Sequence, residues 1–79
     1  MALHLSLNGE SREFSSPLTV AELLRQLELD PAKVAVERNL EIVPKSAYQR
    51  SDLSEGDRLE IVHFIGGGAG PTKPLDGPL

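Results

Sequence analysis

The sequence of 79 residues contains no cysteine and no tryptophan, and only one tyrosine and two phenylalanines. Without cysteine there is no disulfide, no thiolate nucleophile and no cysteine-ligated metal. No apolar run approaches the roughly 18 residues of a membrane span. The first ten residues also lack the basic start and long apolar stretch of a signal peptide. These absences lead us to expect a cytoplasmic protein that does not bind a membrane.

Basic residues are in the minority, because eight Lys and Arg stand against twelve Asp and Glu, for a net charge of -4. A protein that follows a phosphate backbone carries clustered Lys and Arg, so we do not expect a nucleic-acid partner. The hydrophobic fraction of 39% and the charged fraction of 25% are typical of a soluble globular fold. The length allows one small domain, whose aliphatic residues must mostly enter the core.

The first part of the chain has the pattern of a β-hairpin. Leucines alternate with polar residues from Leu3 to Leu7, which predicts a half-buried strand. The pair Asn8-Gly9 that follows is a strong hairpin signal, because both residues tolerate positive φ. Residues 11–15 are then expected to form the returning strand.

The hydrophobic period then changes to that of a helix. From Val20 onward, apolar residues recur at i, i+3, i+4 and i+7, which places them on one stripe. Thr19 and Glu22 have the spacing of a capping box. Pro31 disfavours helical backbone at the residue before it. We therefore expect one helix from about residue 20 to residue 28 or 29.

Further extended segments follow the helix. Residues 33–39 are predicted to form a strand with Val34 and Val36 on one face, and a short piece that stops at Pro44 is predicted to be an edge strand. Residues 58–65 are apolar on both faces, which favours a central position in the sheet.

The predicted order of elements is therefore that of an α+β protein with a β-β-α-β-β mixed sheet. A single helix with one apolar stripe needs a sheet to cover it. This order predicts the β-grasp arrangement, with one packed helix and with the first and last strands paired in parallel.

The composition changes at residue 66. Five of the seven glycines and three of the six prolines lie in residues 66–79, where hydrophobic periodicity is absent. Such a segment does not form a packed element. We therefore predict a β-grasp domain over residues 1–65 and a flexible Gly/Pro-rich C-terminal tail over residues 66–79.

The glycine triplet Gly66-Gly67-Gly68 admits several interpretations. A phosphate loop needs G-x-G-x-x-G or a Walker-type lysine between a strand and a helix, and only Pro-rich sequence follows here. A flexible linker is the commonest meaning of such a composition. The functional alternative is a slender tail that enters a narrow channel of another protein, to which glycine is suited because it lacks Cβ.

No set of residues predicts a self-contained catalytic site or a metal site. His4 and His63 alternate with core residues on their strands, and nothing nearby completes a site, so we interpret both as strand surface. Ser15-Ser16 lacks a matched His or Asp. The acidic residues contain no pair spaced for a hydrolase.

A charged stretch covers residues 37–45, beginning within the end of the strand predicted over residues 33–39. A solvated loop and a partner-docking rim are both compatible with it, and the sequence alone leaves the two open. The charged residues are Glu37, Arg38, Glu41 and Lys45.

Two stretches, "VAVERNLEIVPKSAY" and "LSEGDRLEIVHFIGGG", make the chain similar to the sulfur-carrier proteins of thiamine biosynthesis. The "LNGE" start and the "TVAELL" helix agree with this resemblance, which covers residues 1–68. The stretch "DRLEIVHFIGGG" is its specific part. A Gly-Gly end by itself is also found in the molybdopterin-synthase small subunit and in ubiquitin-like modifiers.

The resemblance implies a ubiquitin-like protein cosubstrate rather than an enzyme, with no bound cofactor. In this family a ubiquitin-activating-like adenylyltransferase uses ATP to adenylate the C-terminal glycine. Sulfur from a cysteine desulfurase then replaces AMP to give a thiocarboxylate, and thiazole synthase consumes that sulfur. The resemblance makes Gly68 the carrier residue, and Gly66 and Gly67 the tail that enters the partners. Val62 and Phe64 are expected to face a partner, with Phe64 as an exposed anchor.

The chain departs from the family because residues 69–79 follow the glycines. The carbonyl of Gly68 is then an amide, which cannot be adenylated, so we expect a processing peptidase to remove residues 69–79. An artificial extension is a second interpretation of these residues, and a non-carrier interaction domain of ubiquitin-like shape is a third. A carrier like the molybdopterin-synthase small subunit is a further alternative, although "ERNLEIVPKSAY" fits it less well.

Overall fold

The computed structural model describes residues 1–64, which form five strands, one α-helix and two short 3₁₀ helices. The elements are β1 (Ala2–Leu7), β2 (Glu10–Ser15), α1 (Val20–Gln26), η1 (Pro31–Lys33), β3 (Val34–Arg38), β4 (Glu41–Val43), η2 (Lys45–Ala47) and β5 (Arg58–His63). Residue 65 and the predicted tail over residues 66–79 lie outside the described part of the chain. The predicted division at residue 65 is therefore not tested by the structure.

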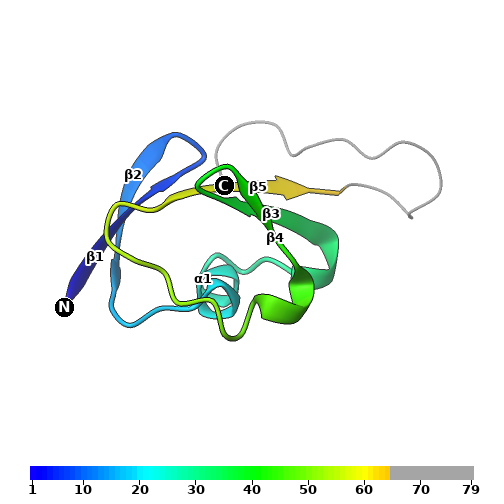
Figure 1. The fold of residues 1–79 in the computed structure, drawn as a ribbon, viewed down its shortest axis with the longest axis horizontal. Helices are drawn as coiled ribbons and strands as arrows, with labels where there is room; N and C mark the ends of the chain where they lie inside the picture. The colour runs from blue at the N-terminus through cyan, green and yellow to red at the C-terminus, as the bar shows by residue number, and fades with distance from the viewer. Residues whose placement is uncertain (65–79) are drawn as a thin grey trace.

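The five strands form one mixed sheet in the order β2-β1-β5-β3-β4 (Figure 1). β5 lies at the centre, where it pairs in parallel with β1 and antiparallel with β3. β1 pairs antiparallel with β2, and β3 pairs antiparallel with the short edge strand β4. The predicted β-grasp arrangement, the central last strand and the edge strand before Pro44 are all confirmed.

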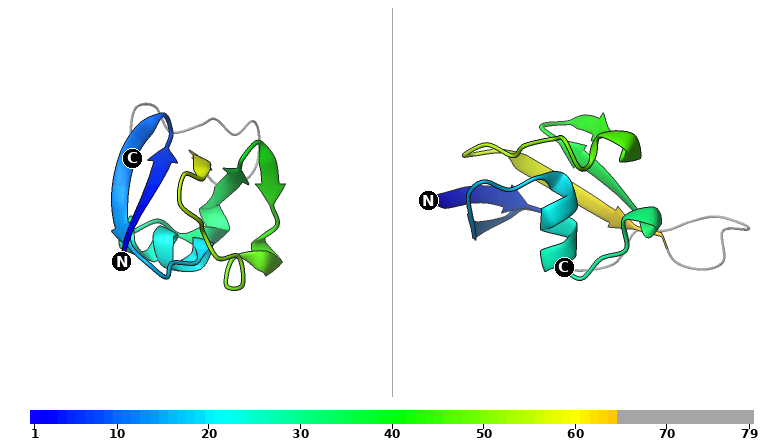
Figure 2. Two further views of the ribbon diagram at one scale, coloured as in Figure 1. Left: turned by 60° about the vertical axis from the view of Figure 1, so that its left-hand side comes forward. Right: turned by 90° about the horizontal axis from the view of Figure 1, so that it is seen from below.

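The helix α1 covers one face of the sheet (Figure 2). Its apolar stripe of Val20, Leu23 and Leu24 is fully buried. The stripe packs in one core with leucines of β1, valines of β3, and Leu59 and Ile61 of β5. Burial of this apolar surface is the main source of stability for such a small domain. None of the helices within residues 1–64 has the length and apolar composition that a membrane crossing requires.

The helix ends earlier than the sequence predicts, at Gln26 instead of residue 28 or 29. Glu28 takes the left-handed conformation with φ of 60°. The amide of Leu29 then donates to the carbonyl of Leu24, and that of Glu28 to the carbonyl of Arg25. These two bonds make a Schellman motif, which satisfies carbonyls that the helix end leaves free. The helix therefore stops by this motif before Pro31 has any effect.

Both hairpins turn through two residues with positive φ, as a type I′ turn requires. The first turn uses Asn8 (φ 51°) and Gly9 (φ 86°), as predicted, and β2 begins at Glu10, one residue early. The second turn, between β3 and β4, uses Asn39 (φ 52°) and Leu40 (φ 73°). Leucine rarely adopts this conformation, so the sequence did not predict the second turn.

Side chains from the strands on both sides hold β5 in register. The amide group of Asn8 donates to the carbonyl of Ile61 and accepts from its backbone N–H, at 3.2 and 2.8 Å. On the other side, Asn39 accepts from the N–H of Arg58 at 2.9 Å and donates to the carboxylate of Asp57 at 3.0 Å. Each asparagine lies just beyond the end of β1 or β3, and its side chain extends the hydrogen bonding between that strand and β5.

The predicted apolar character of both faces of β5 is wrong. Leu59 and Ile61 point into the core beneath the sheet, whereas Arg58 and Glu60 are exposed on the opposite face. A mixed sheet with helices on one side leaves its other face to solvent, so its strands alternate in polarity. The strand also ends at His63, before the predicted residue 65.

Candidate functional site

The central strand β5 is the element that directly precedes the glycines in the sequence. His63 pairs with Val34, and the backbone N–H of Phe64 donates to the carbonyl of Lys33 at 2.8 Å. The last described residue is thus held beside η1 and the start of β3. The predicted carrier residue Gly68 and the tail residues Gly66 and Gly67 lie outside the described residues, so their roles stay predictions.

The two residues predicted to face a partner are both partly buried. Val62 lies directly opposite Ala35 of β3, on the face that α1 does not cover. Phe64 is not an exposed anchor as predicted, because its backbone is held against the end of η1 and its side chain is partly covered. A role for either residue in partner binding stays a prediction.

We call the side of the sheet away from α1 the open face. On this face Glu37 of β3 stands directly opposite Glu60 of β5 on one side and Ile42 of β4 on the other. Ile42 is 65% exposed, an unusual position for a large aliphatic side chain. Ala35 and Val62 form the next row of the same face. Sequence reasoning missed Glu60 and Ile42 as candidates, since only the strand register brings them beside Glu37.

The charged stretch over residues 37–45 is neither simply a solvated loop nor simply a docking rim. Arg38 donates from Nε to Oδ2 of Asp57 at 2.8 Å, and its Nη2 forms an ion pair with the same oxygen at 2.8 Å. Lys45 donates from Nζ to the carbonyl of Val34 at 2.6 Å and to that of Pro31 at 3.1 Å. Both cations therefore serve the fold. Among the described residues Glu37 and Glu41 take part in no ion pair, and both remain candidates for a docking surface.

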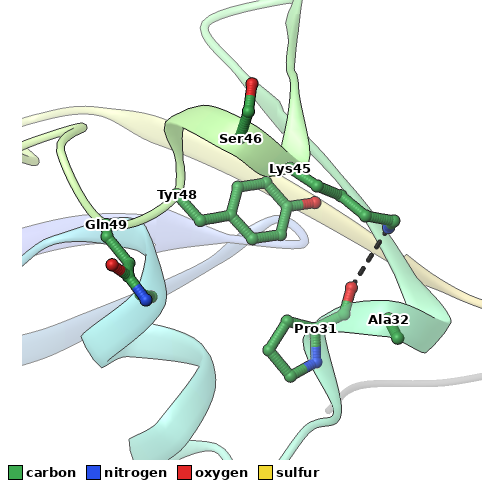
Figure 3. A pocket seen from close by; sticks show the side chains of 7 residues that line it. Pro31, Ala32, Lys45, Ser46, Tyr48 and Gln49 are labelled. Carbon is green, nitrogen blue, oxygen red and sulfur yellow. Dashed lines mark hydrogen bonds between the residues drawn. The ribbon is translucent and has the colours of Figure 1, made fainter.

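A separate pocket of about 410 Å³ lies beside α1 (Figure 3). Lys45 is its only charged lining group, and its ammonium is already bonded to the Pro31 carbonyl within the pocket wall. Burial raises the pKa of the Tyr48 hydroxyl, while a hydrogen bond with the Val36 backbone acts in the opposite direction. No lining residue joins a nucleophile to a base, so we assign this pocket no chemistry. The lining residues are Ala21, Pro31, Ala32, Lys45, Ser46, Tyr48 and Gln49.

The two histidines have different environments. His4 is exposed and ties β1 to the loop before β5, with Nδ1 3.1 Å from Glu55 and Nε2 3.5 Å from Glu13. A hydrogen bond from the backbone N–H of His4 is the main cause that lowers the pKa of Glu55. The prediction of strand surface is therefore confirmed for His4. For His63 it is wrong: the side chain is partly buried, and Nδ1 is buried without a hydrogen-bond partner in the described part of the chain.

Metal binding is not suggested by the described residues. Within residues 1–64, no three His, Cys, Asp or Glu side chains gather closely enough to hold an ion. His4 contacts Glu55 and Glu13 through different ring nitrogens, Nδ1 and Nε2, so the three side chains do not converge on one point.

The sheet order, the single covering helix and the central strand that leads to the glycines define a ubiquitin-like β-grasp protein. The sequence profile of the ThiS family matches residues 5–68, which include Gly68. The chain belongs to the ThiS family. This assignment confirms the resemblance seen in the sequence, and it confirms for this domain the prediction of a carrier protein rather than an enzyme.

The curated relatives include both sulfur carrier proteins and thiazole synthases. The sulfur carrier protein ThiS of Bacillus subtilis is 42% identical over 65 residues, which cover 81% of this chain and 98% of that protein. A thiazole synthase of Paramagnetospirillum magneticum is 58% identical over 67 residues, which cover 85% of this chain and 21% of that protein. The chain thus spans about a fifth of the length of that thiazole synthase, and the same share, 21%, of a thiazole synthase of Magnetococcus marinus.

A solved structure agrees with the fold. The crystal structure of the thiamine biosynthesis protein ThiS of Geobacter metallireducens has a TM-score of 0.73 and 32% sequence identity to this chain. The match covers 84% of this chain and 100% of that one. The arrangement of strands and helix described above is therefore that of the family.

Proposed function

We propose that this domain is a sulfur carrier for the thiazole ring of thiamine, with Gly68 as the carrier residue. The observation that carries the proposal is the family match, which runs through the whole described domain and on to Gly68. It is supported by the position of β5, whose last paired residues lie at the sheet centre only a few positions before the glycines. A rigid sheet would thus present a terminus whose last three residues lack side chains.

The proposed chemistry takes place on the terminal carboxylate of Gly68. A carboxylate resists nucleophiles at neutral pH, so a partner must first activate it. Its oxygen attacks the α-phosphorus of ATP, which forms an acyl-adenylate and releases pyrophosphate. A persulfide sulfur then attacks the acyl carbon and AMP leaves. Reductive cleavage of the resulting acyl disulfide by a thiol leaves the thiocarboxylate on Gly68. The carrier itself needs no cysteine and no bound cofactor for these steps.

Three partners follow from this chemistry. A ubiquitin-activating-like adenylyltransferase uses the ATP, a cysteine desulfurase supplies the persulfide, and thiazole synthase accepts the sulfur. The thiazole synthases of P. magneticum and M. marinus support the last partner, because each contains a segment similar to this chain. Placing a carrier and its acceptor on one chain raises their effective concentration. A cytoplasmic location stays a prediction.

Residues 69–79 must be absent from the active form under this proposal. With them in place the Gly68 carbonyl belongs to a peptide bond, and the oxygen that would attack ATP is missing. We propose that a peptidase cleaves after Gly68. The length of the Bacillus subtilis sulfur carrier protein ThiS supports this proposal, because 65 residues of this chain match 98% of it.

The test compares the chain ending at Gly68 with the full chain of 79 residues. Each is mixed with its cognate adenylyltransferase and ATP, and pyrophosphate release is measured. We expect release only from the shorter chain, followed by an oxygen-to-sulfur exchange in its intact mass once the desulfurase and cysteine are added. Absence of pyrophosphate from the shorter chain, or equal release from both chains, would contradict the proposal.

A further inference from the structure

Two carboxylates face each other on the open face of the sheet, and neither takes part in an ion pair within residues 1–64. Glu37 of β3 and Glu60 of β5 are direct partners in the antiparallel register, so their Cβ atoms lie about 5 Å apart. Like charges in this position destabilise a sheet. The three ion pairs within residues 1–64 join other groups, and Arg58, two residues before Glu60, takes part in none of them.

Aliphatic side chains surround this carboxylate pair. Ile42 lies opposite Glu37 on its other side and is 65% exposed. Ala35 and Val62 occupy the adjacent row on β3 and β5. These three side chains lie outside the buried core, which is built on the other face from α1 and the inward residues of the strands. The fold therefore gains little from the exposed isoleucine and loses stability through the paired charges.

Natural proteins keep such locally unfavourable groups where function requires them. We propose that the surface formed by Ala35, Glu37, Ile42, Glu60 and Val62 binds an arginine of the adenylyltransferase that activates Gly68, with aliphatic neighbours of that arginine covering Ile42 and Val62. The inference rests on the proposed function, because it names the surface by which the carrier is held while its terminus reacts.

The chemistry of the surface selects arginine. A guanidinium is planar and carries five N–H donors, so one group bonds two carboxylates at once, whereas a lysine ammonium is a compact and strongly hydrated charge. The apolar stem of the arginine packs on side chains such as Ile42 and Val62. The net charge of -4 adds a favourable long-range attraction to a basic partner surface. The surface includes β5, which is the strand that leads to the glycines.

The experiment uses Glu37→Gln, Glu60→Gln and the double variant, in the full chain and in the chain ending at Gly68. Binding to the purified adenylyltransferase is measured by calorimetry, and unfolding is measured in urea. We expect the double variant to bind at least about tenfold more weakly. We expect its unfolding equilibrium constant to fall by about two- to fivefold, since the repulsion is removed. Weaker binding to the adenylyltransferase together with a more stable fold is the combined result that supports the proposed role.

The matched control is Glu10→Gln. Glu10 is an exposed glutamate of β2 that takes part in no ion pair within the described residues, and its substitution removes the same charge. We expect this variant to bind the adenylyltransferase like the unchanged chain. A loss of affinity equal to that of Glu37→Gln or Glu60→Gln, each of which removes one charge as Glu10→Gln does, would reduce the effect to net charge and overturn the inference.

Further results of these binding and unfolding experiments also test the inference. Unchanged binding by the double variant overturns the inference, and so does unchanged binding accompanied by loss of self-association, which would assign the surface to a second copy of the chain. If the double variant is less stable in urea than the unchanged chain, the glutamate pair stabilises the fold, and the inference is overturned as well. If the unchanged chain ending at Gly68 binds the adenylyltransferase but releases no pyrophosphate, the proposed function fails while the inference stands.

Discussion

Asp57 is the residue on which the start of β5 depends. It is the one charged side chain buried within residues 1–64, at 7% exposure. Burial alone raises the pKa of its carboxyl, but hydrogen bonds from Asn39 and the Ser54 backbone, and the nearby charge of Arg38, outweigh burial. Together they hold the pKa of Asp57 below its ordinary value of 3.8. The ionised form is therefore the form that the fold requires.

We expect Asp57→Asn to lower the free energy of unfolding by about 1–3 kcal/mol at pH 7, because Arg38 loses its counter-ion. A lowered pKa in the folded state gives stability that is complete above the ordinary pKa and is lost as pH falls through the folded value. The difference in the free energy of unfolding between Asp57→Asn and the unchanged protein, measured in urea, should thus narrow below about pH 4. The control, Asp52→Asn, alters an exposed aspartate without side-chain bonds among the described residues. A difference in the free energy of unfolding that does not change with pH would contradict the role of the Asp57 charge.

At the scale of elements, α1 is too short to be stable by itself. A helix of seven residues falls well below the length at which isolated helices form in water. Both its ends are capped: the Schellman motif closes one, and the capping box closes the other. There, Thr19 Oγ1 accepts from the Glu22 amide at 3.1 Å, and Glu22 Oε1 accepts from the Thr19 amide at 2.8 Å. The caps hold the helix in place so that its apolar stripe can cover the sheet.

We expect Thr19→Ala to reduce the free energy of unfolding by about 1 kcal/mol, since the amide of Glu22 loses its acceptor. Thr19→Ser is the control, because it keeps the hydroxyl and should unfold close to the unchanged protein. Urea unfolding followed by circular dichroism gives both values. Identical midpoints for the alanine and serine variants would show that the hydroxyl does not cap the helix.

The whole molecule is organised around β5. This strand is paired on both sides, whereas β2 and β4 are the edges of the sheet (Figure 1). Leu59 and Ile61 lie in the core, and β5 is anchored by the side chains of Asn8 and Asn39. Opening of the edges leaves these contacts intact, but opening of β5 separates the two halves of the sheet.

Native-state hydrogen exchange should follow this order. We expect the amides of β5 to exchange only through global unfolding, and the amides of β4 to exchange about 10- to 100-fold faster through local opening. The same order should persist in low concentrations of urea, where only the exchange of β5 amides should accelerate strongly. Slower exchange in β4 than in β5 would contradict the central role of β5.

Elements that depend on neighbouring residues could be predicted from the sequence. The alternating leucines of β1, the Asn8-Gly9 turn and the capping box at Thr19 each involve residues close together in the chain, and all three are confirmed. The end of α1 could not be predicted, because glutamate seldom takes the left-handed conformation that Glu28 adopts. The turn at Leu40 escaped prediction for the same reason.

The candidate site likewise has features that the sequence determined and features that only the structure showed. The sequence by itself determined the family and the glycine triplet, since both lie in one continuous stretch that ends at Gly68. Only the tertiary structure decided that Glu60 meets Glu37, that His63 turns partly inward and that Arg38 is bound by Asp57. The physical reason is strand register: pairing joins residues far apart in the chain, and a slip of one position would move every side chain to the other face of the sheet.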